Sequence, residues 1–174
     1  KEKGVAPRLT IFAAGRPKYL ENEPAGFSEG DVMKEIYDRR IGTNIGSNSK
    51  TLVLRENKNT QDDLLNSLAT AIEKGCKTAV IVHTEISIPR TIEMYRLALK
   101  AHPELKVLQV QIVPSERLLR ERYAKNPNAL KKLDRMLQEL RNSKAWEYMQ
   151  EREDSGIQAL KGKEEGGYKG RGNY

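Results

Sequence analysis

Four short apolar runs separated by helical patterns constrain the fold of this chain more than any other sequence feature. The runs lie at residues 9–14, 51–54, 78–82 and 105–113. Between them, apolar side chains recur every three or four residues, the period of an amphipathic helix. Strands that alternate with helices pack as right-handed βαβ units around a parallel sheet. The sequence therefore predicts an α/β fold, a three-layer α/β/α Rossmann-like sandwich with a mainly parallel sheet and a helical C-terminal extension.

The helical patterns also predict which side chains face the sheet. The first helix opens at Ser28, the second follows Asn59 and Thr60 and is capped by Gly75, and the third has Pro89 in its first turn. The run at 78–82 is almost wholly apolar, which is typical of a strand covered by helices on both faces. The predicted inward side chains are Val32, Met33, Ile36 and Tyr37 in the first helix, Leu64, Leu65, Leu68 and Ile72 in the second, and Ile92, Met94, Tyr95 and Leu99 in the third.

After Pro114 the sequence changes character, which suggests a Rossmann-like core over residues 1–114 and a helical extension over 115–160. Residues 115–124 and 128–141 have helical patterns, and the second carries an apolar stripe of Leu130, Leu133, Met136, Leu137 and Leu140. This stripe is expected to pack on the sheet or on a partner subunit, and a dedicated recognition helix is the alternative. Residues 161–174, basic and rich in glycine, are predicted to be disordered when alone.

Charge and cysteine content limit the partners and the compartment. The net charge of +7 over 174 residues favours anionic partners such as phosphates or nucleic acid, although a generic soluble surface would carry the same balance. The single cysteine, Cys76, excludes an intrachain disulfide, as expected for the cytoplasm or another reducing compartment. One cysteine and two histidines do not make an ordinary structural zinc site, so no metal is expected. No apolar run is long enough to span a membrane, and an anchor would have to precede Lys1.

Polar side chains follow three of the predicted strands. Ligands of open parallel sheets bind outside the carboxyl ends of the strands, where helices begin. The predicted ligand-binding residues at these ends are Gly15, Arg16, Ser28 and Glu29, then Asn59 and Thr60, and then Thr84, Glu85 and Arg90. The competing interpretation is local: Ser28 with Asp31, and Thr60 with Asp63, both fit helix capping boxes. Arg90 lies in the first turn of a helix, where a cation opposes the helix dipole, so we expect it to pair with Glu85 or to hold an anion.

The order and spacing of these motifs resemble the SanA/ElyC/YdcF-like family of bacterial Rossmann-like domains. The resemblance spans residues 9–113. The family's motifs fall on Ser28, Glu29 and Met33, on Asn59, Thr60 and Asp62, and on His83, Thr84, Glu85, Ser87, Ile88, Pro89 and Arg90. Ser87 replaces the family's usual histidine, Asp63 replaces an asparagine, and no counterpart of the family's first strand precedes Leu9. The resemblance implies a small anionic or nucleotide-like ligand, and it names S-adenosylmethionine as a cofactor because one type of member has been associated with it.

Two functions follow from these residues. In the first, Arg16 and Arg90 hold the negative charge of a small ligand, and Glu85 or Glu29 is the candidate catalytic acid–base of an enzyme whose reaction the sequence does not define. Neither a convincing nucleophile nor a Walker or Gly-x-Ser-x-Gly motif is present. In the second, the chain is a non-catalytic component of a ribonucleoprotein or other large assembly. It would contact that assembly through the basic segment 115–174.

Overall fold

The computed structural model describes residues 9–14, 28–39, 50–57 and 59–165. These residues form two compact units, the first reaching Lys77 and the second beginning at Thr78. Gly15 and Arg16, two of the predicted ligand-binding residues, lie outside the described ranges, as do residues 166–174 of the predicted tail.

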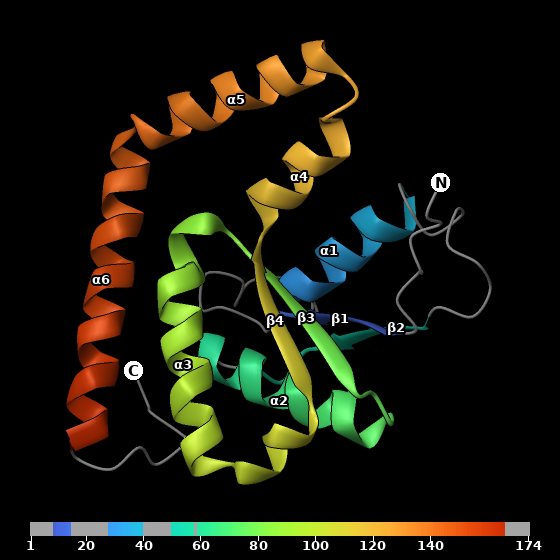
Figure 1. The fold of residues 1–174 in the computed structure, drawn as a ribbon, viewed down its shortest axis with the longest axis vertical. Coiled ribbons are helices and arrows are strands. Elements are labelled where there is room, and N and C mark those ends of the chain that lie inside the picture. Colours follow the sequence, from blue (N-terminus) through green and yellow to red (C-terminus); the bar gives the residue numbers. More distant parts are fainter. Residues whose placement is uncertain (1–8, 15–27, 40–49, 58, 166–174) are drawn as a thin grey trace. The chain divides into compact units, whose positions relative to one another are not determined.

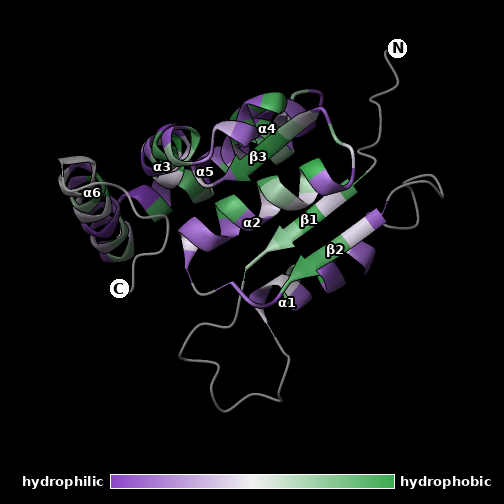
Figure 2. Ribbon diagram, turned by 90° about the horizontal axis from the view of Figure 1, so that it is seen from below, coloured by the Kyte–Doolittle hydropathy of each residue, from purple (hydrophilic) through white to green (hydrophobic). Residues whose placement is uncertain are grey.

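The first unit is a parallel strand pair with a helix on each side. Its elements are β1 (Leu9–Ala13), α1 (Glu29–Tyr37), β2 (Lys50–Leu54) and α2 (Thr60–Glu73). β1 and β2 pair in parallel, with Leu9 opposite Lys50 and Ala13 opposite Leu54. Both helices contact both strands, and Figure 2 shows α1 and α2 on opposite sides of the pair. The predicted parallel pairing of the first two strands is confirmed.

Helix α1 packs on the strands through a different face from the predicted one. Val32, Met33 and Ile36 are exposed, so their assignment to the core is wrong. The helix instead approaches the strands at the buried Gly30, whose N–H donates to the carbonyl of Ala14 at 3.1 Å. Because glycine lacks a side chain, the helix backbone comes closer to the strands there than larger residues would allow. About two helix turns further on, the ring of Tyr37 meets Phe12 edge-on, with 5.4 Å between the ring centroids.

Helix α2 follows its sequence pattern closely. Leu64, Leu68 and Ala71 are buried against the strands, as the amphipathic period predicts. The helix ends in a Schellman motif, in which Cys76 N–H donates to the carbonyl of Ala71 and Gly75 N–H to that of Ile72. Gly75 has a φ of 72°, a conformation that glycine adopts without steric cost, so its predicted capping role is confirmed.

The second unit is another βαβ unit, followed by three helices. Its elements are β3 (Thr78–His83), the short 3₁₀ helix η3 (Glu85–Ser87), α3 (Ile88–Ala101), the 3₁₀ helix η4 (Pro103–Val107), β4 (Gln109–Pro114), α4 (Ser115–Tyr123), α5 (Pro127–Arg141) and α6 (Lys144–Glu165). β3 and β4 pair in parallel, from Thr78 opposite Gln109 to His83 opposite Pro114. The last strand starts later than predicted, because the residues after Pro103 form η4 before the chain extends.

Helix α3 covers one face of the β3–β4 pair. Thr91, Met94, Leu97 and Ala98 are buried, whereas Ile92 is exposed and its predicted core position is wrong. Burial alternates along β3, and on the face that carries Val80 and Val82 both side chains are exposed, Val80 to 61%. Helices therefore cover one face of this strand within its own unit, and not both faces as its apolar sequence predicted.

The C-terminal helices extend the second unit without covering this valine face. Figure 1 shows α6 running beside α3, and its residue Leu160 is fully buried. Helix α5 links α4 to α6 and has no buried residue; Met136 and Leu140 of its apolar stripe are exposed. Within the described ranges the stripe thus packs on no sheet, and a partner subunit or a recognition role for this helix stay predictions. None of the described helices combines the length and apolar character needed to cross a membrane.

Candidate functional site

The start of α1 is held by a capping box at the carboxyl end of β1. Ser28 is fully buried; its Oγ accepts the N–H of Asp31, and the carboxylate of Asp31 accepts the N–H of Ser28 at 3.0 Å. Both bonds satisfy N–H groups that the first turn of a helix leaves open. The local interpretation of Ser28 is confirmed, and its hydroxyl, which also donates to Asp31 at 2.8 Å, is already engaged.

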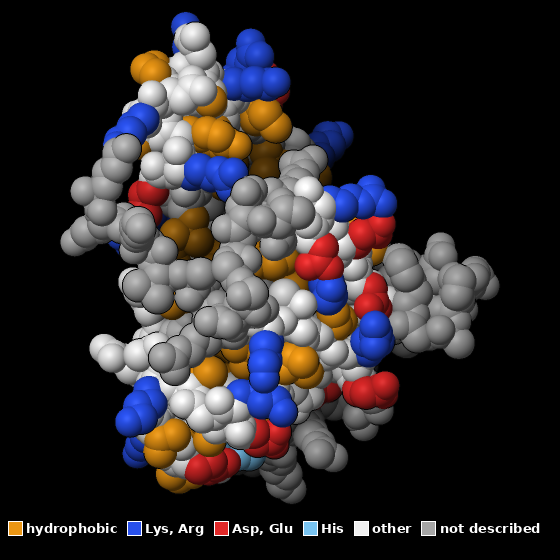
Figure 3. Space-filling view, turned by 90° about the vertical axis from the view of Figure 1, so that its right-hand side faces the viewer, with side chains coloured by type: hydrophobic (Ala, Val, Ile, Leu, Met, Phe, Trp, Pro, Cys, Tyr) orange, Lys and Arg blue, Asp and Glu red, His pale blue; other side chains and the backbone are white. Residues whose placement is uncertain are grey.

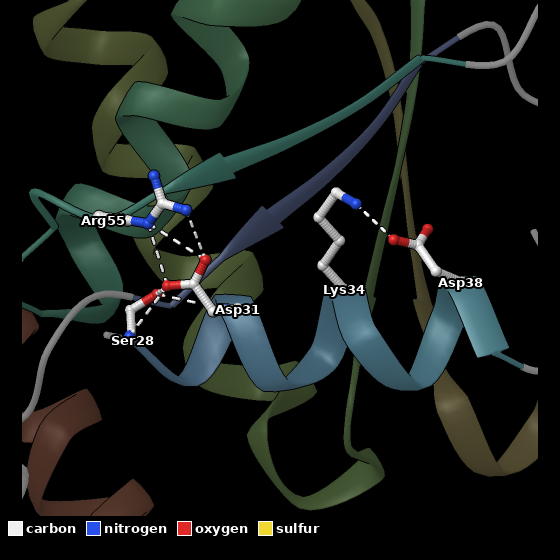
Figure 4. A network of polar contacts seen from close by, with 5 residues as sticks. All are labelled: Ser28, Asp31, Lys34, Asp38 and Arg55. Carbon is white, nitrogen blue, oxygen red and sulfur yellow. Dashed lines mark hydrogen bonds and ion pairs between the residues drawn. The ribbon is translucent and has the colours of Figure 1, made fainter. Parts of the chain in front are cut away.

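Arg55, directly after β2, ties the end of that strand to the same cap. Its guanidinium donates to both carboxylate oxygens of Asp31, with Nη2 at 2.7 Å and Nε at 3.0 Å (Figure 4). This hydrogen bond lowers the pKa of Asp31 below its usual value, against the opposing effect of burial. The pair joins α1 to β2 and fixes the geometry of this strand edge. Arg55 is not among the residues predicted from the sequence, although it carries the same signal as they do, a polar side chain directly after a strand.

The cap of α2 is Asn59 and not Thr60. The Asn59 side-chain oxygen accepts the N–H groups of Gln61 and Asp62, each at 3.0 Å. The predicted capping box of Thr60 and Asp63 is therefore wrong, since Asp63 bonds to another residue. The first N–H groups of α2 are also less available to an anion than the sequence interpretation assumed.

An amide–carboxyl network centred on the buried Asn57 lies behind this cap. Asn57 is almost fully buried; its Nδ2 donates to Asp63 at 2.8 Å, and its Oδ1 accepts from Asn66 at 2.6 Å. Burial raises the pKa of Asp63 to about 6, the Asn57 bond opposes this rise, and the charges of Asp62 and Glu29 add to it. A half-buried carboxyl that titrates near neutrality at the carboxyl end of a parallel strand is a feature typical of functional sites.

Asp63→Asn is expected to change how stability depends on pH. In the folded chain the pKa of Asp63 lies above its ordinary value of 3.8, so the protonated form is favoured by folding. The stabilisation is complete below 3.8 and is lost as the pH rises through about 6. Urea unfolding between those values should show a loss of stability in the wild type and a smaller loss in Asp63→Asn, whose amide can still accept from Asn57. Equal slopes in both proteins would contradict the raised pKa.

In the second unit, polar side chains gather where β3 ends. The ring Nδ1 of His83 accepts the N–H of Thr84 at 3.0 Å, and Thr84 Oγ1 lies 3.2 Å from the hydroxyl of the buried Ser87. Burial lowers the pKa of His83; the carboxylates of Glu153 and Glu116 act against this, and Arg90 reinforces it. His83 is thus hydrogen-bonded at the end of the strand, and its burial favours the uncharged ring.

The two charged residues of this strand end, Glu85 and Arg90, are bonded to side chains from α4, α5 and α6. Glu85 donates its backbone N–H to the buried carboxylate of Glu116 at 2.8 Å, and its own carboxylate pairs with Arg141. Arg90 pairs with Glu153 of α6, at 3.5 Å between Nη1 and Oε1. The expected pairing of Arg90 with Glu85 is therefore not the one observed. No sequence pattern pointed to Glu116, Arg141 or Glu153, because their roles depend on the way the last three helices fold back.

The structure brings the predicted residues together in two groups. Ser28, Glu29, Asn59 and Thr60 share one edge of the first unit, and Thr84, Glu85 and Arg90 share one loop and helix start in the second. The convergence of all of them on one rim stays a prediction. In the described ranges no group of three or more His, Cys, Asp or Glu side chains is placed to hold a metal ion.

No protein-family model, curated protein or solved structure matches this chain. The SanA/ElyC/YdcF-like resemblance therefore rests on the quoted motifs alone.

Proposed function

We propose that this chain binds a small nucleotide-like ligand at the carboxyl ends of its parallel strands, as a divergent SanA/ElyC/YdcF-like protein with a three-layer Rossmann-like sandwich. The supporting observation is the network of the buried Asn57 with Asp63 and Asn66, beside the helix starts that carry Glu29 and Asn59. The network includes a carboxyl, Asp63, whose pKa is raised by burial, and a perturbed carboxyl at a strand edge favours a functional role.

The charges at this edge favour a ligand rich in hydroxyl groups over a simple anion. The one described basic side chain there, Arg55, is held by Asp31. The acidic side chains on the strand ends and first helix turns are Glu29, Asp31, Glu56, Asp62 and Asp63. Carboxylates accept hydrogen bonds from the hydroxyls of a sugar, as acidic residues do for the ribose of bound dinucleotides. We therefore assign the sugar of the ligand to this edge. That Arg16 and Arg90 hold its phosphate stays a prediction from the sequence.

Isothermal titration with AMP, ATP and S-adenosylmethionine tests this proposal. Asp63→Asn is expected to weaken binding of the recognised ligand by about tenfold or more, the loss of one charge-assisted hydrogen bond. Wild-type affinity should rise as the pH passes about 6, because ionised Asp63 is the better acceptor. Asp38→Asn, an exposed carboxylate at the other end of α1, is the matched control and should bind as the wild type does. Equal affinities in Asp63→Asn and wild type, or no binding of any of the three ligands, would refute the proposal.

The proposed sandwich requires a helical layer over the exposed valine face of β3. If such a layer covers this face, Val80→Lys should clearly lower the free energy of unfolding, because the lysine would place a charge beneath the layer. Val107→Lys is the control, since Val107 in η4 is exposed to a similar extent, 64% against 61% for Val80. Similar unfolding midpoints for the two lysine variants would mean that the valine face is open, and would exclude the three-layer arrangement.

A second function, contact with RNA in a larger assembly, is favoured by one observation on α4 and α5. Residues 115–141 carry eight Lys and Arg against four Asp and Glu, and Arg122, Lys125, Lys131 and Lys132 form no ion pair with the described residues. Figure 3 shows basic and apolar side chains side by side at this end of the second unit. Replacing Lys131 and Lys132 by Gln should weaken RNA binding and flatten its salt dependence. RNA affinity that is independent of salt would exclude this function.

A further inference from the structure

Arg90 forms an ion pair with Glu153 of α6, at 3.5 Å between Nη1 and Oε1. Its guanidinium is only 20% exposed and the partner carboxylate of Glu153 only 17%, so the pair is largely screened from water. Arg90 extends along the backbone of α6: a Cβ built on Gly156 would lie 2.8 Å from Arg90 Nε and 3.1 Å from Cζ. The glycine thus leaves room for this arginine against the helix.

The contact is incomplete on the α6 side. The second carboxylate oxygen of Glu153, Oε2, is buried and has no hydrogen-bond partner. A buried acceptor without a donor weakens the docking of the helix that carries it. Leu160 is the one buried side chain of α6 among residues 144–162, so the apolar anchor of this 22-residue helix is small. The connecting helix α5 has no buried residue, and its described tie to η3 is the ion pair of Arg141 with Glu85.

We infer that α6 is a displaceable internal competitor at Arg90, where Glu153 takes the place of the phosphate group of a ligand. This rests on the proposed ligand-binding function and adds its regulation. Docking of α6 and binding of a phosphate group at Arg90 exclude one another. A ligand that binds only the undocked state loses apparent affinity in proportion to the fraction of molecules in which α6 is docked.

Inorganic phosphate titrated into the full chain tests this competition. Glu153→Gln removes the competing charge but keeps the shape of the side chain, so it should bind phosphate at least about threefold more tightly than the wild type. The double variant Arg90→Gln, Glu153→Gln should lose that gain. Phosphate affinity that does not change in Glu153→Gln, or a gain that persists without Arg90, would overturn the inference.

Hydrogen exchange of residues 144–165 provides a second readout that does not depend on ligand affinity. Phosphate should accelerate exchange of α6 in the wild type, and Gly156→Ala should accelerate it without phosphate by pressing on Arg90. Gly162→Ala is the matched control, because a Cβ at Gly162 meets no atom within 4 Å. Faster exchange in Gly156→Ala with no phosphate effect on the wild type would show a purely structural contact and overturn the inference. If nucleotides bound equally well to Asp63→Asn and to the wild type, the proposed function would be refuted, while the phosphate result at Arg90 would stand.

Discussion

Leu97→Ala is expected to lower the free energy of unfolding by about 2 to 5 kcal/mol, the usual range for truncating a fully buried leucine. Leu97 is 1% exposed and lies on α3, the helix that contacts β4, η4 and α6. The change removes buried apolar surface and leaves a cavity where three elements meet, so no single neighbour can move to fill it. Urea unfolding followed by circular dichroism measures the effect.

Leu140→Ala is the control for this prediction. Leu140 lies on the exposed stripe of α5 and is 40% exposed, so its truncation should cost less than about 1 kcal/mol. A similar loss in the two variants would mean that α3 is not the centre of the core in this unit, or that α5 is covered in solution.

Gly30→Ala is expected to destabilise the first unit by about 1 to 3 kcal/mol, the cost of overpacking. A Cβ at Gly30 would lie 2.8 Å from Val53 Cγ1 and 3.1 Å from the carbonyl oxygens of Phe12 and Ala14. Backbone carbonyls do not move aside easily, and a valine has few rotamers to choose from. Helix α1 must therefore shift away from the strands, which also strains the bond between Asp31 and Arg55.

Gly162→Ala is the control that separates overpacking at Gly30 from the effect of alanine on helix propensity. Both glycines lie within helices, and alanine alone would favour a helix by up to about 1 kcal/mol. Gly162 faces open space, so its replacement should be neutral or stabilising. If Gly30→Ala were as stable as Gly162→Ala, the close approach of α1 to β1 and β2 would be refuted.

The sequence predicted local structure well where short-range chemistry decides it. The apolar runs, the cap at Ser28, the stop at Gly75 and the start of α3 around Pro89 depend on residues a few positions apart. The positions of Ser28 and Asn59 at helix starts after parallel strands also follow from local order, while their role in ligand binding stays a prediction. Asn57 and Asp63 were less visible, since their burial comes from packing and not from any motif.

The prediction of buried side chains was wrong where the pattern of a helix allows more than one of its faces to pack on the strands. In α1 the apolar side chains of Val32, Met33 and Ile36 are exposed, because the helix packs on the strands at Gly30 instead. In α3, Ile92 is exposed while Thr91 and Leu97 are buried. Periodicity shows that a helix has a face, but the contact with the strands selects which face is used.

Local order along the chain is sufficient for the alternation of strands and helices, the parallel pairing that it implies, and the position of polar groups at strand ends. Which charges meet depends on the three-dimensional packing of the helices. Glu153 lies 63 residues from Arg90, and Arg141 lies 56 residues from Glu85. Pairs so far apart in the chain depend on how three helices fold back, and local propensities carry no information about that return path.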